Sequence, residues 1–188
     1  MKKLALLLAI TMAAAWPAAA GDTGILKLSL WGDIAIAAPN NIDSITGLDL
    51  GIGSKANTVD GVQYDFIYSD AHKVRGIKTA WIYNTADIVY GIQGGAVTIN
   101  REDMRGVQGG LLALSEGKMQ GAQLGWINWA NGETTGAQWG FVNNANHITG
   151  VQLGLVNIAK NIHGLQLGLV NLAKNGWFPV MVFVNGRF

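Results

Sequence analysis

The segment Gly150-Val-Gln-Leu-Gly-Leu-Val-Asn157 is followed by a near copy of itself, Gly164-Leu-Gln-Leu-Gly-Leu-Val-Asn171. The first glycine of this unit recurs upstream at intervals of 14 or 15 residues, and such regularity indicates a repeat architecture. Counted as position 0 of each unit, these glycines are Gly47, Gly61, Gly76, Gly91, Gly106, Gly121, Gly136, Gly150 and Gly164. The repeat covers most of the chain, so it decides the fold class.

Side-chain character alternates within each unit, which predicts a strand and not a helix. Positions +1, +3 and +5 carry no Asp, Glu, Lys or Arg in any unit. The opposite face carries glycine at 0, usually glutamine at +2 and usually glycine at +4. Seven of the eight glutamines of the chain occupy position +2, so these side chains share one environment. In chain order the +2 residues are Asp49, Gln63, Lys78, Gln93, Gln108, Gln123, Gln138, Gln152 and Gln166.

The pattern predicts an all-β fold, for which two architectures remain open. Short segments rich in turn formers separate the units, and loops this short connect antiparallel neighbours. The pattern of apolar residue, Gly, Gln, Gly and apolar residue is also the same when it is read backwards. Neighbouring strands of a meander run in opposite directions, so they need such a pattern to bring like residues to the same level. We therefore expect an antiparallel up-and-down meander of about 10–12 strands closed into a membrane β-barrel, with positions +1, +3 and +5 facing lipid. The alternative is a β-solenoid with 14–15-residue coils, in which the same apolar positions fill the core.

The two ends of the chain favour export. Residues 1–20 combine a basic start, a short apolar run and a final Ala18-Ala-Ala20, which predicts a cleaved secretory signal peptide and leaves 21–188 as one β-repeat domain. The alternating end of the chain resembles the assembly signal of bacterial outer-membrane barrels. Its residues are Val180, Val182, Val184 and Phe188. The expected location is the bacterial outer membrane, with the lipid bilayer and the outer-membrane assembly machinery as partners; secretion or display at the cell surface is the alternative.

The repeat also resembles the bacterial surface-repeat proteins, a secreted and largely uncharacterised group built from Gly-x-Gln-x-Gly-x-x-Asn units. The resemblance extends from about Gly47 to Asn171 and is strongest from Gly121 onward. It implies an exported, envelope-associated protein and carries over no catalytic residue.

Composition excludes several classes of protein and site. With 49% hydrophobic and 13% charged residues, the chain is not disordered, and without cysteine it has neither disulfides nor cysteine-ligated metal. A formal net charge of +1 gives no reason to expect nucleic acid binding. His72, His147 and His163 lie in separate turn regions and form no metal-ligand pair. We therefore expect no catalytic residue, no metal site, no cofactor and no enzymatic activity.

Charged residues on the glutamine face indicate which side of the strands is interior. Asp65 and Lys78 fall on this face, and Lys27 and Asp33 fall on the matching face of an alternating stretch at 24–37. A lysine facing lipid at mid-membrane is unfavourable by ~2–4 kcal/mol, so these are expected to be lumen charges, with Asp65 and Lys78 interacting.

The glutamines themselves have two interpretations. They line a narrow polar pore, or they hydrogen-bond to one another and plug the interior, which we favour because so small a barrel has little spare width. The predicted function is a structural, narrow-pore or surface-interaction role. The alternative is a secreted solenoid used for adhesion or assembly.

Overall fold

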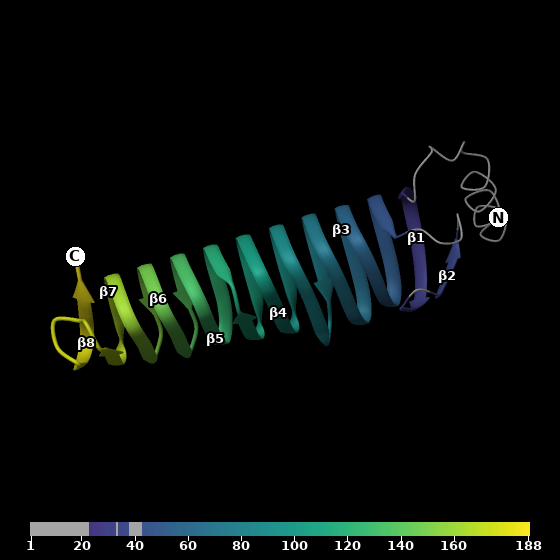
Figure 1. Ribbon diagram of the computed structural model, residues 1–188. Helices are drawn as coiled ribbons and strands as arrows, with labels where there is room; N and C mark the ends of the chain where they lie inside the picture. Colours follow the sequence, from purple (N-terminus) through teal and green to yellow (C-terminus); the bar gives the residue numbers. More distant parts are fainter. Residues whose placement is uncertain (1–22, 33, 38–42) are drawn as a thin grey trace.

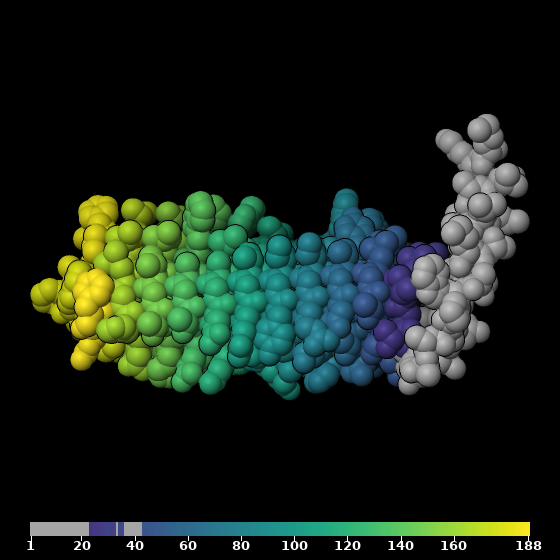
Figure 2. Space-filling model, turned by 90° about the horizontal axis from the view of Figure 1, so that it is seen from above, coloured from purple at the N-terminus to yellow at the C-terminus, as the bar shows by residue number. Residues whose placement is uncertain are grey.

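The computed structural model describes residues 23–32, 34–37 and 43–188, and these form a β-solenoid (Figure 1). The chain winds in similar coils along one axis, so β1 and β8 lie at opposite ends of the described solenoid (Figure 1). The space-filling view shows the same rod, with colour changing steadily from end to end (Figure 2). The predicted signal peptide, residues 1–20, and Asp33 lie outside the described residues.

One sheet contains all the strands, and its longer strands pass through more than one coil without interruption. The strands are β1 Thr23–Trp31, β2 Ile34–Ala37, β3 Ser44–Ala80, β4 Tyr83–Ser115, β5 Lys118–Trp139, β6 Val142–Leu153, β7 Val156–Ala173 and β8 Val180–Arg187. Their order is β2-β1-β3-β4-β5-β6-β7-β8. None of the described residues belongs to a helix that could span a membrane.

The way the strands pair shows that the expected membrane β-barrel was wrong. The structure is a β-solenoid, the alternative that the sequence left open. Strands β3 to β7 pair in parallel, and equivalent residues of successive coils lie side by side, such as Gly76 with Gly91 and Gly106 with Gly121. Parallel pairing requires a crossover of about a dozen residues or more. Here the whole coil provides it, because segments expected to be loops, together with positions +6 to +10, form the return path. The reversal symmetry of the unit is compatible with a meander but does not require one.

The inside of the solenoid is the glutamine face. Fully or almost fully buried side chains come from position +2, from the residue two before each glycine and, in the later coils, from Asn at +7 and Ala at +9, as in Asn143 and Ala145. Positions +1, +3 and +5 point outward, and Leu124, Trp126 and Trp139 are exposed. The expectation that these apolar residues fill a solenoid core was therefore wrong. Stacked amides bond to identical amides one coil away, so a thin polar interior is satisfied by the repeat itself.

Position 0 must be glycine for two independent reasons. From Gly61 to Gly164 these glycines have φ of +134° to +146°, a region that L-residues avoid. A Cβ added to any of them would lie 1.9–2.1 Å from the carbonyl oxygen of the corresponding glycine in the preceding coil. The row of glycines therefore sets how closely successive coils approach.

Antiparallel strands close both ends of the solenoid. β2 pairs with β1, and β8 folds back along β7 so that Arg187 lies opposite Gly164. The residues expected to form a membrane assembly signal lie in or next to β8 and are exposed there: Val180, Val182, Val184 and Phe188. β8 covers the last coil, as a terminal cap does in repeat proteins, and is not the final strand of a barrel.

Candidate functional site

The glutamine row fills the interior of the solenoid. Each glutamine from Gln123 onward donates its side-chain N–H to the side-chain oxygen of the glutamine one coil earlier, over 2.7–2.9 Å. From Gln138 onward, each also donates to a backbone carbonyl six residues later, over 3.2 Å. These amides are fully buried, so along this part of the rod they form a hydrogen-bonded ladder and leave their face closed to solutes.

A second amide ladder runs alongside the first in the opposite sense. Asn128 donates to Asn143, Asn143 to Asn157, and Asn157 to Asn171, each over 2.8 Å. The carbonyl oxygens at the free ends, Asn128 Oδ1 and Gln166 Oε1, have no hydrogen-bond partner among the described residues. The glycine at +4 makes room for this ladder, because a Cβ on Gly154 would lie 2.5 Å from Asn143 Nδ2.

The first coils contain charged groups where the later coils contain amides. Asp49 accepts hydrogen bonds from Ser29 at 3.0 Å, Ser54 at 2.5 Å and Gln63 at 3.0 Å, so its carboxylate is well satisfied. Lys27 Nζ donates to a backbone carbonyl at 2.6 Å. All the described members of the predicted polar row and lumen charges are thus buried side chains of a filled interior.

Asp65 and Lys78 are both fully buried but do not form the direct contact expected from the sequence. Lys78 Nζ donates to Ser69 Oγ at 2.5 Å, and neither carboxylate oxygen of Asp65 has a hydrogen-bond partner among the described residues. Burial, reinforced by Asp49, raises the pKa of Asp65 to about 7. Burial likewise lowers the pKa of Lys78 to about 7, against the attraction of Asp65. Enclosed in this way, the pair has no access to a substrate.

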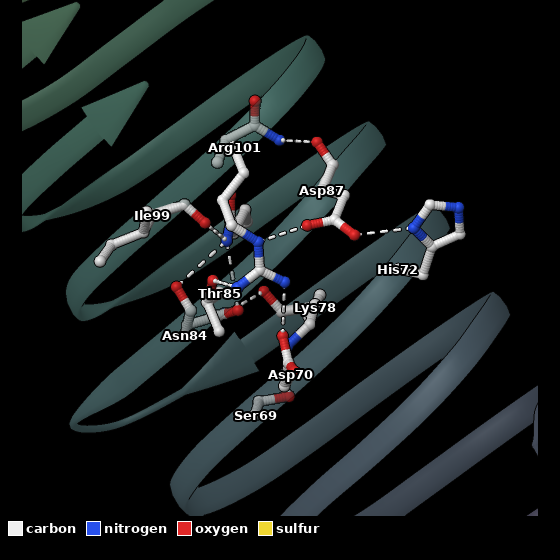
Figure 3. Close-up of polar contacts among 11 residues, drawn as sticks. Ser69, Asp70, His72, Lys78, Asn84, Thr85, Asp87, Ile99 and Arg101 are labelled. Carbon is white, nitrogen blue, oxygen red and sulfur yellow. Dashed lines mark hydrogen bonds and ion pairs between the residues drawn. The ribbon is translucent and has the colours of Figure 1, made fainter. Parts of the chain in front are cut away.

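The densest group of exposed charges surrounds Arg101, on the long edge of the solenoid formed by positions +10, +11 and −1, which we call the charged edge (Figure 3). The guanidinium bonds to Asp87, to Asp70 at 3.0 Å and to Thr85 at 2.9 Å. His72 Nδ1 lies 2.7 Å from the other oxygen of Asp87. Partial burial acts to raise the pKa of Asp87, but the hydrogen bonds from His72 and Arg101 lower it overall.

A hollow of about 440 Å³ opens beside this network and includes Asp43, Lys55 and Asn57 in its lining. Within the described ranges, no three His, Asp or Glu side chains are arranged to hold a metal ion. The hollow also lacks a serine or threonine hydroxyl for His72 to activate, because its lining contains neither residue type. The network joins neighbouring coils electrostatically.

The opposite long edge is apolar, and we call positions +1, +3, +5 and +6 together the apolar edge. Every residue at position +5 is apolar, and the large side chains of this row are roughly 40–60% exposed. The row is Ile52, Phe66, Trp81, Ala96, Leu111, Trp126, Phe141, Leu155 and Leu169. The apolar edge continues onto the terminal cap at Phe183, which lies opposite Gly168 and is exposed. Trp177 and Phe188, with ring centroids 5.9 Å apart, are exposed near the C-terminal end of β8, which pairs with Gly164.

A groove of about 500 Å³ lies on the apolar edge. Its floor is the backbone of the +4 glycines from Gly110 to Gly154, and its walls are leucine, tryptophan and phenylalanine side chains at +3 and +5. Trp126 and Phe141 meet edge to face across 5.8 Å. The lining includes no charged residue, so its chemistry suits an apolar partner.

Charge is distributed unevenly along the rod, a feature that the overall net charge conceals. Residues 43–133 contain ten Asp and Glu residues against seven lysines and arginines, whereas residues 134–188 contain no Asp or Glu and three lysines and arginines. Those bases are Lys160, Lys174 and Arg187, all exposed. Counting charge by segment, and not over the whole chain, would have shown this asymmetry from the sequence.

A scan against protein families, a search of curated proteins and a search of solved structures find no match to the chain. Its function is therefore argued from the geometry of the apolar edge and from the distribution of charge.

Proposed function

We propose that the protein is an exported β-solenoid of the cell envelope that works by attachment, not catalysis, and that its apolar edge is the attachment surface. This is a surface or assembly role. The observation that carries it is the uncharged row of exposed aliphatic and aromatic side chains that follows the solenoid from the first coils to the terminal cap.

The size of the surface supports a binding role. Eight steps of ~4.8 Å separate Gly47 from Gly164, and positions +1 to +5 span ~13 Å, so this part alone covers roughly 500 Å². The largest apolar patch on a typical monomeric protein is about 300–600 Å² and is often functional. Position +6 extends the same surface around the corner of each coil, and Trp129, Ile158 and Leu172 at +8 extend it further in later coils, so the whole surface exceeds what solubility favours.

The interior and the charged edge have other tasks. The amide ladders hold the coils together, and the Arg101 network links neighbouring coils at the surface. A solenoid also presents a long and regular surface, which suits attachment along a line.

The proposal is tested by placing charge on the apolar edge. In Trp126→Glu/Trp139→Glu, two exposed indoles are replaced by carboxylates without disturbing a buried group. The matched control is Gln120→Glu/Thr149→Glu, which adds the same charge at exposed positions of the charged edge. Circular dichroism verifies that both variants fold.

The readout is partition of the folded protein between water and a detergent-rich phase. We expect the unmodified protein and the control to enter the detergent phase, and the apolar-edge variant to move at least tenfold toward water, because a carboxylate must be desolvated to enter an apolar surface. Recovery of the unmodified protein in the aqueous phase would contradict the proposal.

A further inference from the structure

We propose that the partner of the apolar edge is an anionic lipid bilayer, and that the last coils, with Lys160, Lys174 and Arg187, recognise its negative charge. This inference rests on the proposed attachment function and names the partner. It is carried by three observations: unneutralised bases, their position beside apolar side chains, and the uneven relief of the apolar edge.

Lys160 and Lys174 occupy the same position, +10, in successive coils. The backbone N–H of Lys174 bonds to the carbonyl of Ala159, so the two residues start about one strand spacing, ~4.8 Å, apart. Residues 134–188 contain no Asp or Glu, and among the described residues neither lysine forms an ion pair. At the same position four coils before Lys160, Arg101 is held between Asp70 and Asp87. The paired lysines lack any such counter-charge, and an anion brought to them relieves their mutual repulsion.

The lysines lie on the charged edge, at the side where it borders the apolar positions +6 and +8 of the last coils. Alternate residues leading to Lys160 are Val156 and Ile158, and the matching residues of the next coil are Val170 and Leu172, all partly or largely accessible. Lysine side chains beside such residues lay their methylene stems along apolar surface and extend the ammonium to phosphate at the level of the headgroups. The segment is therefore apolar where it would meet acyl chains and basic where it would meet headgroups.

The terminal cap adds aromatic anchors next to the third base. Trp177, Phe178 and Phe188 are 50–80% exposed, and Arg187 lies between the exposed strand residues and the chain end. Tryptophan is enriched at membrane–water interfaces, where its ring meets apolar chains and its N–H meets water.

The relief of the apolar edge favours a fluid partner over a second copy of this chain. In the +3 row, Gly94 and Gly109 present no side chain, whereas Leu124 and Trp139 follow in the next coils. A second copy of this chain would have to be complementary in shape to pack against this uneven surface as closely as a protein interior does. Where two glycine hollows faced each other, the interface would contain voids. Acyl chains are mobile and fill them. Two copies aligned side by side would also bring like-charged lysines together.

The test measures binding of the folded protein to vesicles of phosphatidylcholine alone and of phosphatidylcholine with one quarter phosphatidylglycerol. The variant is Lys160→Gln/Lys174→Gln. The control is Lys73→Gln/Lys118→Gln, which removes two lysines from the coils that contain carboxylates. Each lysine near an anionic surface contributes about fivefold to partition, so we expect the variant to bind the anionic vesicles about 30-fold more weakly than the unmodified protein. The control changes this binding less than threefold, and salt weakens the binding of the unmodified protein.

Other outcomes overturn the inference in distinguishable ways. Equal binding to both vesicle types, or equal loss in the variant and the control, removes the role of the lysines but leaves apolar attachment intact. Partition into detergent without binding to any vesicle rejects the bilayer as partner and keeps the proposed function. A concentration-dependent dimer by analytical ultracentrifugation, without vesicle binding, identifies a second copy as the occupant. Failure to enter either detergent or vesicles rejects the proposed function itself.

Discussion

The coils formed by residues 43–133 and those formed by residues 134–173 share one backbone geometry but neutralise charge differently. In the first group, Asp49, Asp65 and Lys78 replace amides inside, and Arg101 holds carboxylates outside. In the second group the interior is uncharged, with two continuous amide ladders, and the exterior bases have no carboxylate to pair with. The glycine at position 0 is common to both groups, and its φ changes little between them. The coil is thus set by the glycine row, while the side chains around it differ with the task of each region.

This difference gives the rod a polarity. The first coils pair surface bases such as Arg75 and Arg101 with carboxylates of the chain, whereas the last coils carry exposed bases without an ion pair among the described residues and a cap rich in exposed aromatic residues. Of the two regions, the one with the more regular interior is the one whose surface bases form no ion pair among the described residues.

The largest expected effect tests what the two regions share. Gly76→Ala and Gly150→Ala each place a Cβ at 1.9–2.1 Å from a backbone oxygen of the preceding coil and force alanine to a φ of +136° or +143°. Backbone cannot move aside cheaply, so we expect each substitution to lower the free energy of unfolding by more than about 5 kcal/mol, equally in both regions. Urea unfolding followed by circular dichroism measures this.

The control lies in the same type of strand. At Gly109 a Cβ meets no atom closer than 3.7 Å and the backbone is not in the left-handed region, so Gly109→Ala is expected to change stability by less than about 1 kcal/mol. If Gly76→Ala were tolerated while Gly150→Ala unfolded the protein, the two groups of coils would not share one geometry.

The glycine spacing also shows how far the sequence determines the structure. The period, the strand character, and the inward direction of Gln63 and its equivalents follow from alternation and from the confinement of glutamine to position +2. Parallel and antiparallel stacking do not follow, because a unit that is symmetric on reversal fits both. The φ of the glycine at position 0 and its close contact with the preceding coil distinguish the two kinds of stacking. The sequence does not show this, because a glycine at a strand end and a glycine at a tight contact between coils are the same letter.

The outward direction of the apolar residues was predictable only in part. Alternation places Leu124 and Gln123 on opposite faces, but the usual preference for apolar cores made the leucine face the natural choice for a solenoid interior. That preference fails here because the buried glutamines from Gln108 to Gln166 bond to one another from coil to coil, which a single sequence unit does not show. The importance of Lys160 and Lys174 depends on what is missing nearby, so it emerges only when charges are counted by region.

The next effect in size tests the charged interior of the first coils. The Asp65 pKa, raised to about 7 by burial, means that the folded state binds this proton more tightly than the unfolded chain, so stability falls as pH rises from about 4 to 7. The Lys78 pKa, lowered to about 7 by burial, means that the folded state holds its proton less tightly, so stability rises again above pH 7. The unmodified protein should therefore have a stability minimum near neutral pH, with a depth of about 2–4 kcal/mol.

Asp65→Gly/Lys78→Gln is the variant that sharpens this point, because it installs the glycine and glutamine that the later coils carry at +4 and +2. We expect the minimum near pH 7 to disappear from its urea-unfolding profile and its stability at pH 7 to exceed that of the unmodified protein. Lys78→Gln alone leaves the buried carboxyl without its nearest opposite charge, so it should be less stable than the double variant at pH 7. If the stability of the unmodified protein did not change with pH, the pKa values of Asp65 and Lys78 would be the same in the folded and the unfolded chain, and the prediction would be wrong.

The smallest expected effect compares the surface charges of the two regions. Arg101→Ala removes the hydrogen bonds to Asp70, Asp87 and Thr85, and we expect it to lower the free energy of unfolding by about 1 kcal/mol, the scale of a partly exposed network. Lys174→Ala, at the equivalent position of the last full coil, removes no ion pair found among the described residues and should change stability by less than about 0.5 kcal/mol. Added salt should narrow the gap between them, because only the arginine loses a screened attraction. If Lys174→Ala were the more damaging substitution, the lysine would have a structural task within the fold, and its availability to an anionic surface could no longer be argued from its lack of a partner.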